Sequence, residues 1–359
     1  MNPNINELCK DPLFQLNLAI WLAQPQPPSE FYVYPLFYES QLNIYSIGPL
    51  LALPANIREL AVTQKINCQD AVRPDLILAT AGEKKFCILE CKSSSFGPRS
   101  STANQATTLL LIAGPIISEV LGIGKRGENK GILCYFIGPD GAELMEETLR
   151  TLEEEIKDKT KLEPGTYGCF EIKPSQTSII LKYPEKVKIF LNLTKDSPLE
   201  IIKFEENTDP RPLYFIPYDP NIQQTKEGQK LSRRILFERI LGYMICKIGG
   251  ANIPSSITFT TEELLNSATF GLYEIWEDNE AKKHVKRLVK DFLNQIKNFI
   301  NESEPLRGSV IYEPQKGWTF NLKDRETHKE ILKQLQRFKP ETLDLSKKIE
   351  PTLFDNMED

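Results

Sequence analysis

The apolar residues of this 359-residue chain change their spacing along the sequence, and each spacing predicts a type of element. Residues 7–24 carry apolar positions at helical intervals, which predicts a helix. Two short apolar runs further on are typical of strands that are covered on both faces. We expect a strand, a second strand, a helix and a third strand at residues 72–79, 85–93, 101–121 and 131–138.

Beyond residue 165 the apolar period changes to two, which is typical of strands with one buried face. Turn-forming residues separate these runs from one another. We expect a β-rich extension over residues 166–225, with strands at 167–172, 177–182, 187–194 and 213–216.

The last third of the chain returns to helical spacing and then shows a hairpin pattern. Helices are expected at 231–248, from Thr261 onward and at 280–301, with a short extended piece at 258–260. Strands are expected to follow at 308–312 and 317–322. Three helices followed by a β-hairpin is the order of a winged helix-turn-helix. We therefore expect an α/β chain with domains at 1–165, 166–225 and 226–338 and a flexible tail at 339–359.

Composition excludes several classes of function. The chain lacks an uncharged apolar run long enough to cross a membrane, and its first residues lack the pattern of a signal peptide, so we expect a cytoplasmic protein without membrane contact. The seven cysteines are scattered and odd in number, which favours reduced thiols over disulfides. The two histidines suggest no catalytic triad, and no GxxxxGK[ST] or GxGxxG motif is present.

Three charged residues interrupt the first two predicted strands: Asp75, Glu90 and Lys92. Successive side chains of a strand point to opposite faces, so Glu90 and Lys92 share one face. With Asp75 beside them on the neighbouring strand, two carboxylates and one ammonium converge. Mg²⁺ prefers oxygen ligands, and a nearby ammonium can stabilise negative charge on a phosphate. The alternative is a solvated strand end with Asp75 as a turn cap.

Pro74-Asp75 and Glu90-Cys91-Lys92, in this element order, resemble the PD-(D/E)XK nuclease superfamily over roughly residues 55–140. The resemblance implies a restriction-endonuclease-like mixed sheet flanked by helices. It also implies Asp75, Glu90 and the Cys91 carbonyl as ligands of Mg²⁺, with Mn²⁺ as a substitute. Lys92 would activate a water or stabilise the phosphate, and Gln105 would orient the site. Gln105 can equally be an ordinary polar residue near the start of a helix.

Members of this superfamily often use a further acidic residue from a preceding helix or strand. Glu59 is the first candidate for this residue, with Glu30 and Glu39 as alternatives. No pattern in the sequence singles out one of the three, and Asp75 and Glu90 alone could hold one ion.

The predicted helix at 280–301 has one apolar face and one basic face. Because the net charge is −5, contact with DNA would depend on a local basic cluster of this kind. The candidate DNA-binding residues are Lys282, Lys283, Lys286, Arg287 and Lys290 on the helix and Lys316 at the hairpin tip. The alternatives are a solvated basic face or a protein-binding winged helix.

The resemblance implies a Mg²⁺-dependent endonuclease that hydrolyses phosphodiester bonds of double-stranded DNA. Restriction or anti-phage defence is the expected biology, by analogy with other nuclease-plus-reader chains. Two alternatives stay open: a DNA-binding or regulatory subunit with a non-catalytic nuclease fold, and a nuclease that is silent until a partner activates it. The oligomeric state is open between a homodimer and a complex with a defence partner.

Overall fold

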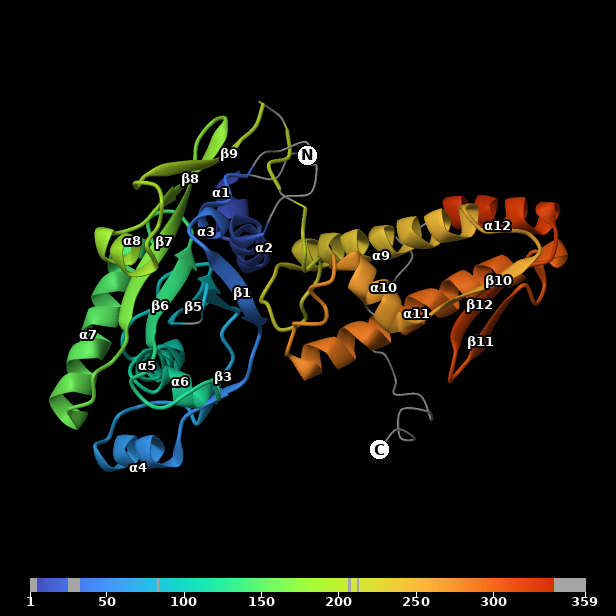
Figure 1. Ribbon diagram of the computed structural model, residues 1–359. Helices are drawn as coiled ribbons and strands as arrows, with labels where there is room; N and C mark the ends of the chain where they lie inside the picture. The colour runs from blue at the N-terminus through green and yellow to red at the C-terminus, as the bar shows by residue number, and fades with distance from the viewer. Residues whose placement is uncertain (1–4, 25–32, 83, 206–207, 212, 339–359) are drawn as a thin grey trace. The chain divides into compact units, whose positions relative to one another are not determined.

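The computed structural model describes residues 5–24, 33–82, 84–205, 208–211 and 213–338 (Figure 1). The chain is divided into two compact units. Unit 1 comprises residues 1–229 and 269–285, and unit 2 comprises residues 230–268 and 286–359. The expected tail at 339–359 lies outside the described residues, and so does Glu30.

Unit 1 is built on a seven-stranded mixed sheet with the strand order β1-β4-β5-β6-β7-β8-β9. The central strands β5, β6 and β7 are parallel, and the remaining pairs are antiparallel. The strands are β1 (Leu42–Ile47), β4 (Leu76–Thr80), β5 (Lys85–Lys92), β6 (Lys130–Ile137), β7 (Thr166–Pro174), β8 (Ser178–Lys182) and β9 (Leu199–Lys203). A small second sheet pairs β2 (Leu51–Ala52) with β3 (Ala71–Val72).

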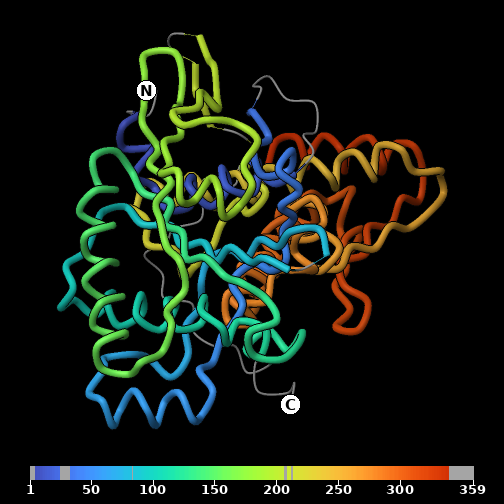
Figure 2. Tube along the Cα trace, turned by 60° about the vertical axis from the view of Figure 1, so that its left-hand side comes forward, coloured from blue at the N-terminus to red at the C-terminus, as the bar shows by residue number. Residues whose placement is uncertain are grey.

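Helices cover both faces of the large sheet, which explains the uninterrupted apolar runs of β4, β5 and β6. Tyr135 faces the core cluster that also contains α5 and α7, whereas Phe136 packs against Phe37 of α3. The helices are α1 (Ile5–Cys9), α2 (Pro12–Ala23), α3 (Leu36–Glu39), α4 (Ala55–Thr63), α5 (Ser101–Ala113), α6 (Ile117–Val120), α7 (Ala142–Thr160) and α8 (Glu185–Leu191). In Figures 1 and 2, α4 is the blue helix at the lower edge of unit 1.

The order of elements expected for residues 72–138 is confirmed, although the first strand begins at Leu76 and Asp75 precedes it. Two expected helices end or begin differently. The helix expected at 7–24 is two helices, because Asp11 caps the second by accepting a hydrogen bond from the Leu13 N–H and Pro12 occupies its first turn. The helix expected at 101–121 ends at Ala113 because Gly114 and a proline follow.

The predictions of two strands in the extension, at 187–194 and 213–216, are wrong. Residues 187–194 lie mostly in α8, which begins after Pro184 and ends at Asn192 in the left-handed conformation. Val187 and Leu191 are four residues apart and both buried, which is helical spacing. Residues 213–216 form no strand. The other strands of the extension join the main sheet, because β7 pairs with β6.

Asn17 of α2 fastens the 213–216 segment to unit 1. Its side chain accepts a hydrogen bond from the Ile216 N–H at 2.8 Å and donates one to the Ile216 carbonyl at 2.9 Å. Asn17 is fully buried, so these two bonds satisfy backbone groups that no strand partner satisfies.

Unit 2 has the expected order of helices followed by a hairpin, and the extended piece expected at 258–260 is a strand that ends at Phe259. Its three-stranded antiparallel sheet has the order β10-β12-β11. Phe237 and Phe292 stack in its core with their ring centroids 4.1 Å apart. The elements that lie wholly or partly in unit 2 are α9 (Lys226–Gly249), β10 (Ser255–Phe259), α10 (Thr261–Ala268), α11 (Asn279–Asn301), β11 (Val310–Glu313), β12 (Gly317–Leu322) and α12 (Arg325–Arg337). Across the described ranges, no helix is both long enough and apolar enough to cross a membrane.

We expect Asn17→Ala to lower the free energy of unfolding by about 2–4 kcal/mol, because it leaves the buried N–H and C=O of Ile216 unpaired. Chemical denaturation monitored by circular dichroism measures this change. Asn43→Ala is the control, because Asn43 is exposed on β1 and its replacement should change stability by less than about 0.5 kcal/mol. Equal stability of the two variants would contradict the fastening role of Asn17.

Candidate functional site

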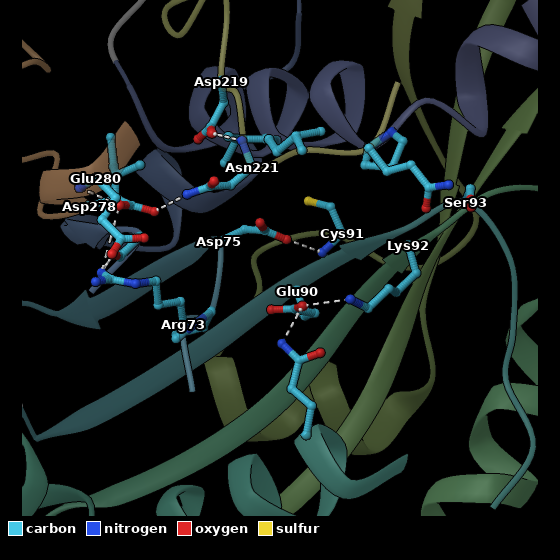
Figure 3. A pocket seen from close by; sticks show the side chains of 18 residues that line it. Arg73, Asp75, Glu90, Cys91, Lys92, Ser93, Asp219, Asn221, Asp278 and Glu280 are labelled. Atoms are coloured by element: carbon cyan, nitrogen blue, oxygen red, sulfur yellow. Dashed lines mark hydrogen bonds and ion pairs between the residues drawn. The ribbon is translucent and has the colours of Figure 1, made fainter. Parts of the chain in front are cut away.

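The charged residues predicted to converge lie together where β4 begins and β5 ends. Leu76 pairs with Leu89 in the antiparallel register of these strands, so Asp75 and Glu90 occupy the next opposing positions. Opposing residues of an antiparallel pair point to the same face, and Lys92 shares that face because it is two residues from Glu90. Figure 3 shows Asp75, Glu90 and Lys92 around one cavity.

Hydrogen bonds fix each of these side chains. The Cys91 N–H donates to Asp75 Oδ2 at 2.6 Å. Lys92 Nζ and Gln105 Nε2 both donate to Glu90 Oε1, at 2.7 and 2.9 Å. Gln105, on the first turns of α5, is therefore part of the site and not only a polar residue near the start of a helix.

Glu90 is 3% exposed, which excludes a solvated strand end at this position. Burying a carboxylate is costly unless it is paired and hydrogen-bonded. Lys92 supplies the opposite charge, and its own side chain is 25% exposed. The strand thus ends in an ion pair with one buried and one accessible partner.

The electrostatic balance around Asp75 favours its protonated form. Loss of hydration and, next, the Glu90 carboxylate raise the pKa of Asp75 well above its usual range, and the Cys91 N–H and Lys92 only partly oppose them. Burial alone would lower the pKa of Lys92, but Glu90 and Asp75 raise it overall. The Lys92 side chain is therefore an ammonium at neutral pH.

Backbone and buried side-chain contacts hold the strand ends in place. The Gly48 N–H donates to the Asp75 carbonyl at 3.1 Å. Gln15 of α2 is fully buried, and its Nε2 donates to the Lys92 carbonyl at 3.0 Å and to the Cys9 carbonyl at 2.9 Å. No pattern in the sequence indicated the role of Gln15, because a lone polar residue on an apolar helix has many explanations.

The other oxygen of Glu90 bears on whether a divalent cation fits the site. Glu90 Oε2 is buried and has no hydrogen-bond partner. Together with the Asp75 carboxylate, it presents oxygen ligands of the kind that Mg²⁺ prefers while keeping several waters. Burial raises the pKa of the Cys91 thiol well above its usual range, so a thiolate ligand is disfavoured. Within the described residues, no group of three or more His, Cys, Asp or Glu side chains is arranged to hold a metal ion.

A second set of polar residues, which sequence reasoning missed, lines the same cavity of about 520 Å³. The Asn221 side chain donates to Asp278 Oδ2, and Asp278 Oδ1 accepts hydrogen bonds from the backbone N–H groups of Glu280 and Ala281 at the start of α11. Arg73 Nη1 lies 4.0 Å from Asp278 Oδ1. Asn221 and Asp278 lie far from Asp75 and Glu90 in the sequence, so no sequence pattern predicted that they line the same cavity.

Asp219 is the acidic residue of this second set that influences Asp75. Its charge adds to the rise of the Asp75 pKa. Burial raises the pKa of Asp219 itself to about 6, although the Asn221 N–H donates to its Oδ1 at 2.8 Å. Glu59 and Glu39, the sequence candidates for a further acid, are exposed and do not line the cavity.

The candidate DNA-binding residues are distributed over both units. Lys282 and Lys283 belong to unit 1, and Lys286, Arg287, Lys290 and Lys316 belong to unit 2. Lys286 pairs with Glu262 at 2.8 Å, and Lys316 pairs with Glu313 at 2.7 Å. Both lysines are therefore already engaged in ion pairs.

No known family, curated protein or solved structure matches this chain.

We expect Asp219→Asn to stabilise the protein at pH 8 by roughly 1–3 kcal/mol, since it removes a buried charge and keeps a side-chain oxygen for the Asn221 N–H. The folded-state pKa of about 6 lies above the usual 3.8. The native state therefore holds its proton more tightly, and stability is lost as pH rises between about 4 and 6.

Denaturation curves of the wild type and of Asp219→Asn from pH 3.5 to 8 test this expectation. The difference between them should grow through that window and vanish below it. The control is Asp70→Asn, because Asp70 is exposed. A difference that does not depend on pH would show that ionised Asp219 carries no penalty.

Proposed function

We propose that this protein is a Mg²⁺-dependent DNA endonuclease that hydrolyses phosphodiester bonds, with Mn²⁺ as a substitute ion. The observation that carries the proposal is the convergence of Asp75, Glu90 and Lys92 on one face at adjoining strand ends, with Glu90 Oε2 buried and unpartnered. The restriction-endonuclease-like fold and a role in restriction or anti-phage defence are part of this proposal and rest on the sequence resemblance.

Asp75 and Glu90 would hold the ion, with the Cys91 carbonyl as a further ligand. The chemistry that such an ion supplies is polarisation of a phosphate oxygen and partial neutralisation of its charge. The raised pKa of Asp75 agrees with this assignment, because a cation would relieve the repulsion between the two carboxylates.

Lys92 contributes a fixed positive charge. Its ammonium lies 2.7 Å from Glu90 Oε1, and its raised pKa keeps it protonated at neutral pH. A protonated amine cannot accept the proton of an attacking water, so of the two roles expected for Lys92 we propose stabilisation of negative charge on the phosphate.

Gln105 and Cys91 act on the geometry of the two carboxylates. Gln105 Nε2 donates to the same Glu90 oxygen as Lys92, which leaves Oε2 directed away from both donors. The Cys91 N–H restrains Asp75 Oδ2. Both carboxylates are thereby restrained before a substrate arrives.

Unit 2 would bind double-stranded DNA as a winged helix. The order of α9, β10, α10 and α11 before the β11–β12 hairpin supports this interpretation, as does the pairing of β10 with β12. Arg287 and Lys290 lie on the basic part of α11 and would contact phosphates, with Lys316 at the hairpin.

A DNA-binding or regulatory role without catalysis is the second candidate. This role is favoured because, within the described residues, no group of three or more His, Cys, Asp or Glu side chains is arranged to hold a metal ion. A nuclease that a partner must activate would behave in the same way when the chain is isolated. Homodimerisation or a defence partner would supply such activation.

We expect Asp75→Ala and Lys92→Ala each to reduce metal-dependent nicking of supercoiled plasmid by about 10²-fold or more, because the first removes a ligand of the proposed ion and the second removes the charge that would stabilise the phosphate. Assays with Mg²⁺, Mn²⁺ or EDTA measure the loss. Matched controls are Asp70→Ala and Lys84→Ala, which replace exposed residues of the same types and should cut at the wild-type rate. Full activity of either site variant would refute the assigned site.

We expect the double variant Arg287→Ala, Lys290→Ala to bind duplex DNA more weakly. Loss of two phosphate contacts should reduce the slope of log affinity against log salt by about 1.8. Fluorescence anisotropy from low to moderate salt measures this slope, and Lys125→Ala, in an exposed loop of unit 1, is the control. An unchanged slope would remove these residues from the DNA interface.

A further inference from the structure

Two buried polar atoms without a hydrogen-bond partner belong to neighbouring strands of unit 1. They are Glu90 Oε2 on β5 and Tyr135 Oη on β6. Buried polar atoms in proteins are nearly always satisfied by protein or by ordered water, so each exception requires a physical reason. One atom is an acceptor and the other carries a proton, which makes them complementary.

The register of the sheet places the two residues side by side. Glu90 pairs with Tyr135 in the parallel β5–β6 ladder. Paired residues of adjacent strands point to the same face, so both side chains lie on the face covered by α5. Burial and then the Glu90 charge raise the pKa of the Tyr135 phenol, which keeps its proton on the oxygen.

Apolar residues pack around the Tyr135 ring. Tyr135 is fully buried in a core cluster that contains Ala103 and Ala106 of α5. The ring of Phe96 packs against it edge-on, with the centroids 5.7 Å apart. Tyr135 is not among the residues that line the cavity of the site.

The donors of the site serve only one oxygen of Glu90. Lys92 and Gln105 both contact Oε1, and neither donates to Oε2. An enclosed water needs two to four polar partners, and a hydroxyl beside a carboxylate oxygen supplies a donor and an acceptor.

We propose that Tyr135 is a positioning residue for Glu90, with its hydroxyl donating toward Glu90 Oε2 through one enclosed water. Tyr135 then restrains Glu90 Oε2, while Lys92 and Gln105 restrain Glu90 Oε1. The inference about orientation stands on the sheet register and burial. Its effect on ion affinity rests on the proposed function.

Tyr135→Phe tests the inference, because it removes the hydroxyl and keeps the ring. We expect Mn²⁺ affinity, measured by isothermal titration calorimetry on the full chain, to fall on the order of tenfold, the lower end of the range for partners of metal ligands. A high-resolution crystal structure of the wild type in EDTA should show a water within hydrogen-bond distance of both oxygens.

Tyr183→Phe is the matched control. Tyr183 is also buried, and its hydroxyl donates to the Lys195 carbonyl at 2.8 Å, so the variant loses a hydrogen bond outside the proposed site. It should lose stability and keep the wild-type Mn²⁺ affinity. A purely structural role of Tyr135 would give the same pattern in both variants.

The outcomes separate the inference from the proposed function. Equal Mn²⁺ affinity of the wild type and Tyr135→Phe would overturn the inference while leaving the ion site intact. If the wild type binds no Mn²⁺, the metal-dependent function fails, and the crystal structure alone decides the inference. Density for a water that bridges the two oxygens would support it, and a phenol with another partner or none would overturn it.

Discussion

A carboxylate buried at the end of an apolar strand is the constraint on which unit 1 depends. Glu90 lies in the run of buried residues of β5 that ends at Cys91, and it is itself 3% exposed. A buried charge of this kind costs several kcal/mol unless donors surround it. Lys92 from the same strand and Gln105 from α5 supply those donors. The position of α5 over the sheet therefore determines whether the carboxylate can be buried at all.

The wall of the cavity depends on a second constraint, which joins distant parts of the chain. Asn17 of α2 holds the segment at Ile216, and this segment leads to Asp219 and Asn221 at the cavity. Asn221 in turn bonds to Asp278, which caps α11. The wall of the site is thus assembled from segments that lie before α9 and at the start of α11.

Local patterns predicted the centre of the site and could not predict its wall. The apolar runs around Asp75 and Glu90 specify two buried strands, and strand alternation then fixes which side chains share a face. The strand predicted at 187–194 was wrong. Val187, Ile189 and Leu191 alternate as they would in a strand, but Pro184 precedes a helix that buries Val187 and Leu191. Asp219 and Gln15 depend on tertiary contacts, which no periodicity encodes.

The charge of the cavity explains why the proposed chemistry would need both a cation and a separate DNA-binding surface. Five acidic side chains and two basic ones line it among the described residues: Asp75, Glu90, Asp219, Asp278, Glu280, Arg73 and Lys92. A phosphodiester would be repelled by such a surface, and the low dielectric of a cavity strengthens the repulsion. A divalent ion between Asp75 and Glu90 would reverse the local sign where the phosphate must lie. Affinity for the rest of the duplex would then have to come from basic residues outside the cavity, such as those of α11.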